Sequence, residues 1–280
     1  MSERGLTVPL LVVVALVGVP LVGYVGDKLV GDAAAREGRD AEVRATEGAL
    51  ADRGIRPVAG WPSSRTGIAG YVAERPFELR PAHGPLQGHA PRAEARERAV
   101  AVLGRELGRY PAGWLARAGL ARVVLTAELT EAGAPIPSLP NYLQTLFVDV
   151  GVGEVYLARL VHHEIFHFFD RATRGRIAVD PEWDALNAPG FAYGTGGRSM
   201  RASWVGEPRR DLAGFVTSYA TSAVEEDKAE LYSFAMTAGP AVREQAAADP
   251  TLQKKLGALA ARLAAFGPPP EGLAGSGAAL

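Results

Sequence analysis

The chain has 280 residues, of which 48% are hydrophobic and 22% are charged, and its formal net charge is -1. This length can bury one large core or two small ones, and the near-neutral charge gives no indication of nucleic-acid binding. The sequence contains no cysteine, which excludes disulfides, thiolate metal ligands and thiol nucleophiles.

The N-terminal stretch carries no charge from Gly5 to Gly26 and is mainly Val, Leu, Ala and Gly. About 20 such residues cross the hydrocarbon core of a bilayer. The stretch is also longer than the apolar region of a typical signal peptide. We therefore expect residues 1–30 to form a membrane anchor, or a secretion signal if they are cleaved. Arg4 and the amino terminus favour a cytoplasmic start, which predicts that the remaining chain lies on the extracytoplasmic side.

The next segment, residues 31–92, is expected to be a stem followed by a linker. Residues 32–53 are rich in Ala, Glu, Arg and Asp, which is typical of a polar helix. Residues 54–92 are rich in Pro and Gly, which indicates a loop with one short strand near residues 77–79.

From residue 93 the apolar pattern becomes globular, and residues 93–266 are predicted to form one domain. Helices are expected at 93–108, 154–171, 222–238 and 241–265, strands at 122–129 and 143–150, and a turn-rich loop at 133–140. The third helix is expected to begin with a capping box of Ser222 and Glu225. The tail, 267–280, is expected to be disordered. These elements predict an α+β fold that is rich in helix and has a small sheet.

The helix predicted at 154–171 contains His163-Glu164-Ile165-Phe166-His167, an HExxH motif. Two histidines four residues apart lie on one face of a helix, so both imidazoles reach one metal ion, and the glutamate is close enough to act as a base. The alternative is a buried helix with two satisfied histidines. His162 points about 100° away from His163 and is expected to be structural or at the surface.

A catalytic zinc site needs a third protein ligand. No histidine follows His167, so we expect a carboxylate from the helix that begins near residue 222. That helix offers Glu225, Glu226, Asp227 and Glu230. With Glu225 in the capping box, Glu226 and Glu230 remain as an i, i+4 pair, of which one binds the metal and the other supports a ligand. Asp227 and the neighbouring Lys228 are expected to be solvated.

The two half-motifs together resemble a family of bacterial zinc metallopeptidases related to the catalytic domain of anthrax lethal factor. The matching residues are His163-Glu164-x-x-His167-x-x-Asp170 and then Tyr219, seven residues before Glu226-x-x-Ala229-Glu230. The resemblance covers residues 95–240 and implies a zincin-like, gluzincin-type domain. It further implies that His163, His167 and Glu226 are the Zn²⁺ ligands, Glu164 is the general base, Tyr219 stabilises the oxyanion and Glu230 is an acid that supports a ligand.

The expected activity is zinc-dependent hydrolysis of peptide bonds in a peptide or protein substrate, at an extracytoplasmic membrane face. Two alternatives remain open: a catalytically silent binding domain with the same fold, and a zinc hydrolase of a non-protein amide such as a peptidoglycan cross-link. Asp170 is expected to orient either His167 or an adjacent loop, and Tyr219 has the alternative of being an ordinary core tyrosine. The strand at 146–150 is expected to offer its edge to an extended peptide.

Overall fold

The computed structural model describes residues 45–81, 84–196, 209 and 211–273. By its internal contacts the chain divides into two compact units, Met1–Asp52 and Arg53–Leu280. In the first unit, residues 45–52 are helical, as expected for this part of the stem. The expected membrane anchor and the end of the C-terminal tail lie outside the described residues. Among the helices that the structure does describe, none has both the length and the apolar character required to cross a bilayer.

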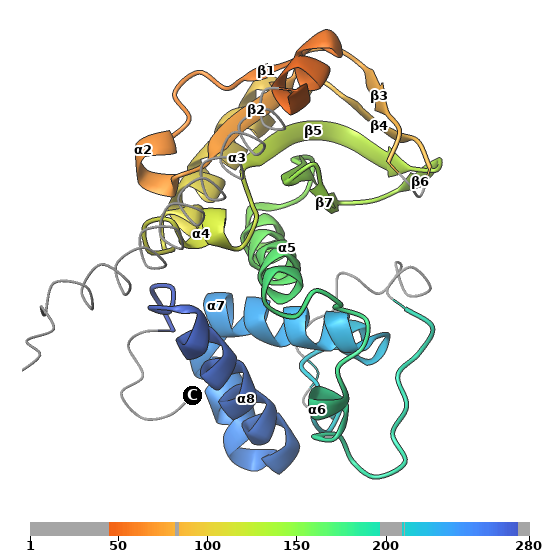
Figure 1. The fold of residues 1–280 in the computed structure, drawn as a ribbon, viewed down its shortest axis with the longest axis vertical. Helices are drawn as coiled ribbons and strands as arrows, with labels where there is room; N and C mark the ends of the chain where they lie inside the picture. The colour runs from red at the N-terminus through yellow and green to blue at the C-terminus, as the bar shows by residue number, and fades with distance from the viewer. Residues whose placement is uncertain (1–44, 82–83, 197–208, 210, 274–280) are drawn as a thin grey trace, which may run out of the picture. The chain divides into compact units, whose positions relative to one another are not determined.

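The second unit is an α+β fold built on a mixed sheet (Figure 1). Its described strands are β1 (Ile55–Pro57), β2 (Ala69–Ala73), β3 (Phe77–Leu79), β4 (Leu86–His89), β5 (Arg122–Glu131), β6 (Ala134–Pro135), β7 (Ser138–Tyr142) and β8 (Thr145–Asp149).

The long strand β5 is the centre of the sheet. Its first half pairs in parallel with β2 on one side and with β8 on the other, while its second half pairs antiparallel with β4 and β6. Val123, Val124 and Leu125 are all fully buried. A continuous apolar run is expected for a strand that is covered on both faces. The predictions of strands at 122–129 and 143–150 are confirmed, the second in the shorter form β8.

The strands before β5 correct the expectation of a linker at 54–92. This range contributes β1 to β4, of which β3 confirms the short strand expected near residues 77–79, and β2 pairs directly with the central strand. Gly70 in β2 illustrates why composition misled: the indole of Trp61 lies against its Cα, where a Cβ would clash. Glycine in this strand therefore serves close packing and does not mark a loop. Likewise, the loop expected at 133–140 contains β6 and the start of β7.

Strand β7 forms an edge of the sheet. It pairs antiparallel with β8, and with no other strand in the described part of the chain. The expectation that β8 offers a free edge is wrong, because β8 has β5 on one side and β7 on the other. Pro140 lies within β7, and proline is tolerated in a sheet mainly on edge strands.

The main helices are α3 (Ala93–Leu107), α5 (Glu154–Arg174), α7 (Val224–Ala248) and α8 (Pro250–Phe266). Short turns of helix lie at α2 (Ser63–Thr66), α4 (Trp114–Arg117), α6 (Pro181–Asp184) and the 3₁₀ turn η2 (Tyr219–Thr221). Figure 1 shows α5 between the sheet and α7, and α5 packs against α3, α7 and β7. Thirteen consecutive or near-consecutive positions of α5 are buried, from Leu157 to Asp170. A helix that is apolar all round is expected in this central place.

Helix α7 differs from its prediction at both ends. It begins at Val224 with Ala223 as its cap, no side chain caps it, and the Ser222 hydroxyl has no hydrogen-bond partner in the described structure. The capping box is therefore wrong. The stop expected at residues 239–240 is a kink, with Ala238 at φ -138° and ψ 35°, after which helix continues through Pro240 to Ala248. Proline removes one helical hydrogen bond and bends the helix without ending it here.

Candidate metal centre

Helix α5 places three side chains of the HExxH motif together. His163, Glu164 and His167 are 4%, 2% and 6% exposed. The i, i+4 spacing puts the two imidazoles on one face of the helix, and their Nε2 atoms are 3.1 Å apart. The two rings therefore aim their outer nitrogens at the same point.

Helix α7 brings Glu226 to that point. Its Oε2 atom is 3.1 Å from Nε2 of His163 and 3.5 Å from Nε2 of His167. One ligand atom from each of the three residues lies within 4.8 Å of the others, and no other described group of His, Asp and Glu side chains forms such a cluster. The neighbouring Glu225 is partly exposed and does not belong to the cluster.

Glu230, one turn further along α7, contacts the second ring nitrogen of His163, the one that does not face Glu226. Its Oε1 lies 2.9 Å from Nδ1 of His163, and its Oε2 accepts a hydrogen bond of 2.7 Å from the Thr217 hydroxyl. Because an ionised carboxylate only accepts hydrogen bonds, Nδ1 of His163 carries a proton, and the ring presents a lone pair at Nε2 once the proton on that nitrogen is lost. The contacts thus orient His163 as a ligand toward the point shared with His167 and Glu226.

The electrostatics of this cluster favour a positive charge at its centre. Burial opposes the charged imidazole, but hydrogen bonds to Glu226 and Glu230 outweigh it and raise the pKa of His163 to about 10. Burial also opposes ionisation of Glu226, yet the two histidines hold the pKa of its carboxyl well below the usual range. In the absence of a metal, a proton on His163 supplies the positive charge that the carboxylates of Glu226 and Glu230 stabilise.

The Glu164 carboxylate has one oxygen held and one oxygen free. Its Oε1 accepts a hydrogen bond of 2.6 Å from the hydroxyl of Ser138 on β7. Its Oε2 is buried and has no hydrogen-bond partner in the described part of the chain. An unpartnered buried carboxylate oxygen is costly unless something else occupies the space beside it.

Tyr219 lies at the same centre, at the start of η2. Its ring centroid is 6.0 Å from that of His163, and the side chain is 3% exposed. Burial, followed by the nearby carboxylates of Glu226 and Glu164, raises the pKa of the Tyr219 hydroxyl well above its ordinary value of 10. The hydroxyl is thus a protonated donor close to both acids.

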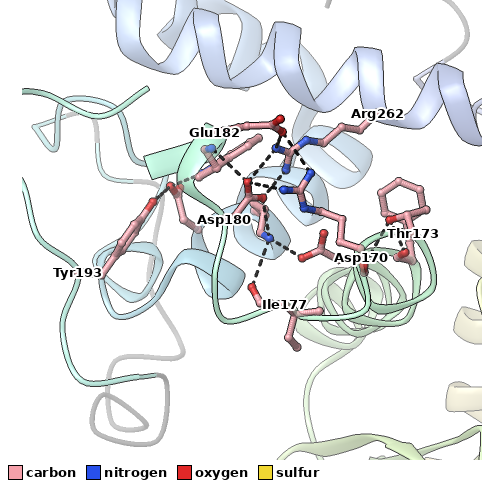
Figure 2. Close-up of polar contacts among 12 residues, drawn as sticks. Asp170, Thr173, Ile177, Asp180, Glu182, Tyr193 and Arg262 are labelled. Carbon is pink, nitrogen blue, oxygen red and sulfur yellow. Dashed lines mark hydrogen bonds and ion pairs between the residues drawn. The ribbon is translucent and has the colours of Figure 1, made fainter. Parts of the chain in front are cut away.

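Asp170 turns away from this centre, toward a loop. Its Oδ2 pairs with the ammonium of Lys228, which also contacts Oδ2 of Asp180 at 3.1 Å and the carbonyl of Ile177 at 3.4 Å (Figure 2). Nδ1 of His167 has no partner among the described residues, so no hydrogen bond joins it to Asp170. Of the two expected roles for Asp170, the contacts correspond to support of the adjacent loop.

The solvation expected for Asp227 and Lys228 is wrong, because both are buried. Asp227 accepts hydrogen bonds at Oδ2 from the Trp183 indole, the Tyr193 hydroxyl and the Lys255 ammonium, at 2.8, 2.6 and 2.7 Å. Burial raises the pKa of Asp227 and lowers that of Lys255. These partners lie 28 to 44 residues from Asp227 in the sequence, so the helix pattern alone gave no sign of them.

His162, beside the motif, is structural. It is fully buried, with Nδ1 2.8 Å from the Tyr110 hydroxyl and Nε2 3.1 Å from Oε2 of Glu106 on α3. Its ring therefore belongs to the packing between α3 and α5.

Sequence reasoning did not identify Ser138 or Thr217 as parts of the site. Both are common residues in segments that showed no motif, and each reaches the site through one side-chain hydrogen bond. Ser138 lies on the edge strand β7, in a range that we expected to be loop.

Comparisons of this chain with protein-family models, with curated proteins and with solved structures find no match.

Proposed function

We propose that this chain is a zinc-dependent peptidase in which His163, His167 and Glu226 hold the metal. The observation that carries the proposal is the spacing of the three ligand atoms, 3.1, 3.1 and 3.5 Å. Around a tetrahedral Zn²⁺ with bonds of about 2.0–2.1 Å, ligand atoms are about 3.3–3.4 Å apart. Two imidazole nitrogens and a carboxylate oxygen are also a donor set that catalytic zinc sites use. The residues present thus fit the ion.

The roles of the surrounding side chains follow from their contacts. When bound, zinc supplies Lewis acidity, which polarises the scissile carbonyl and makes water acidic near neutral pH. Glu164 accepts the proton of the attacking water at its free Oε2 atom and later gives it to the leaving amine. Glu230 keeps His163 in the tautomer that binds metal.

The Tyr219 hydroxyl donates a hydrogen bond to the oxyanion that forms at the scissile carbonyl. The raised pKa of this hydroxyl supports the role, because it keeps the donor protonated at neutral pH. A positioned donor of this kind contributes on the order of 100-fold in rate.

An extended peptide is the substrate that this site suits best. The edge strand β7 packs against α5, the helix that carries His163 and Glu164, and among the described residues its second edge pairs with no strand. Main-chain hydrogen bonds to such an edge give affinity for any extended peptide, and side-chain pockets add specificity. This geometry favours a peptide bond over the non-protein amides that the sequence left open.

We further propose that the chain is related to the bacterial zinc metallopeptidases that resemble the catalytic domain of anthrax lethal factor. The spacing of Tyr219, Glu226 and Glu230 supports this relation. The apolar stretch from Gly5 to Gly26 supports an N-terminal membrane anchor that holds the domain on the extracytoplasmic side.

The full-length protein tests the proposal through its metal content and its cleavage of a peptide library. We expect one zinc per chain and cleavage that a chelator abolishes and zinc restores. The matched control is Glu164→Gln, which keeps the shape of the side chain but removes the base. We expect it to retain zinc and to lose about 100- to 10,000-fold in kcat. Cleavage by Glu164→Gln at the rate of the unaltered protein would refute the assigned base.

A further inference from the structure

We infer that Ser138 is a positioning residue for Glu164, and that the edge strand β7, where the proposed function places the peptide, thereby also sets the position of the catalytic base. This inference depends on the proposed function, in which Glu164 is the base.

The first step is the hydrogen bond itself. The Ser138 hydroxyl donates to Oε1 of Glu164 over 2.6 Å, and the two side chains come from residues that are 5% and 2% exposed. A short bond from a neutral hydroxyl to a carboxylate is among the stronger hydrogen bonds in proteins. Its burial keeps water from replacing the serine as the donor.

The second step is what this bond leaves free. The carboxylate of Glu164 has two oxygens, and Ser138 occupies one of them, while Oε2 has no partner among the described residues. The serine therefore fixes which oxygen takes part in proton transfer and in which direction it points. Without the hydroxyl, the glutamate side chain gains rotamers that carry Oε2 away from the cluster of His163, His167 and Glu226.

The third step is how rigidly the serine is held. Ser138 pairs with Val148 in the ladder between β7 and β8, and the amide of Asp149 donates to the carbonyl of Pro137 over 2.8 Å. Strand β8 in turn pairs along its length with the central strand β5. The hydroxyl is thus presented by the sheet and not by a loop.

The consequence concerns the substrate. A peptide that adds to the edge of β7 that has no strand partner in the described part of the chain takes its register from the same strand that carries Ser138. The scissile bond and the base are then positioned by one element, with a misplacement of about 1 Å costing on the order of 100-fold in rate.

Two variants of the full-length protein test this inference. Ser138→Ala removes the hydroxyl, and Ser138→Thr restores it with one added methyl group. We expect Ser138→Ala to lower kcat about tenfold to a hundredfold, to change KM by less than about twofold and to retain zinc. We expect Ser138→Thr to recover most of kcat. Thr66→Val, which removes another buried hydroxyl hydrogen bond from the same unit, serves as the control and should leave kcat unchanged.

A second readout does not depend on activity. Crystal structures of the metal-free variants should show the Glu164 carboxylate displaced in Ser138→Ala and in its original place in Ser138→Thr. An unchanged Glu164 in Ser138→Ala, or equal losses of kcat in both variants, would overturn the inference. If the unaltered protein cleaves no peptide, the proposed function fails, and the position of Glu164 in these crystals still decides whether Ser138 holds it.

Discussion

The buried ammonium of Lys228 offers a quantitative test of how α5 and α7 are held together. Its side chain is fully buried, as are those of its two partners, Asp170 on α5 and Asp180 in the loop before α6. Asp180 also pairs with Arg262, at 2.7 and 3.1 Å, and with Arg174 at 3.0 Å. The Oδ1 atom of Asp170 has no partner in the described structure, so Lys228 is the partner on which Asp170 depends.

We expect Lys228→Met to leave the Asp170 carboxylate as an uncompensated buried charge. Removing one member of a buried ion pair typically destabilises a protein by about 3–5 kcal/mol. For a unit of this size, each kcal/mol shifts Tm by about 2–4 °C, so the expected decrease in Tm is about 6–20 °C. Methionine matches the length of the lysine stem, and so the loss reports on the charge and not on a cavity.

Urea unfolding in the presence of a chelator measures this effect without a contribution from bound metal. The double variant Lys228→Met with Asp170→Asn should be more stable than Lys228→Met alone, because it carries no unpaired charge. Asp180→Asn should couple less strongly to Lys228→Met than Asp170→Asn does, since Asp180 keeps two arginines. A loss below about 1 kcal/mol in Lys228→Met would refute the view that Asp170 depends on this lysine.

Three further predictions concern the metal centre. We expect Glu226→Ala to lose zinc and Glu225→Ala to keep it, as measured by metal content after dialysis; the reverse result would move the ligand by one residue. Glu230→Gln removes the charge behind His163, and calorimetry should show a 10- to 100-fold loss in zinc affinity with Glu226 still in place; unchanged affinity would argue against this support. Because the pKa of His163 in the metal-free protein is about 10, zinc displaces a proton, and the apparent association constant should fall about tenfold for each pH unit below 10. An affinity that does not change between pH 7 and pH 9 would contradict that assignment.

The sequence predicted the motif helix well because several local signals agreed there. The apolar pattern and the HExxH spacing both placed His163 and His167 on one face of a helix, and α5 extends only three residues beyond its expected end. The strands β5 and β8 could also be predicted from the sequence, since a run such as Val123-Val124-Leu125 suits a central strand.

Of the strands before β5, only β3 was predicted, as the short strand near residues 77–79, because the others form through pairing with distant residues. Strand β2 carries Gly70, which by composition indicates a loop, and only the packing of Trp61 against it explains the glycine. β-strand preference depends on neighbours in the fold more than on the residues themselves. Strand β7, which contains a proline, was not predicted for the same reason. The hydrogen bond between Ser138 and Glu164 could therefore not be predicted either.

The polar core around α7 was missed for a related reason. Asp227 and Lys228 are charged residues on a helix, which local reasoning assigns to solvent. Their partners Lys255 and Asp180 lie 28 and 48 residues away, and no spacing rule connects them. A buried charge is recognisable only when its partner is also known.

X-ray diffraction at the zinc absorption edge, from crystals of the zinc-loaded protein, tests the central claim most directly. We expect one anomalous peak per chain, within about 2.0–2.2 Å of Nε2 of His163, Nε2 of His167 and a carboxylate oxygen of Glu226. A peak elsewhere, or none near these three atoms in a crystal that contains zinc, would contradict the account.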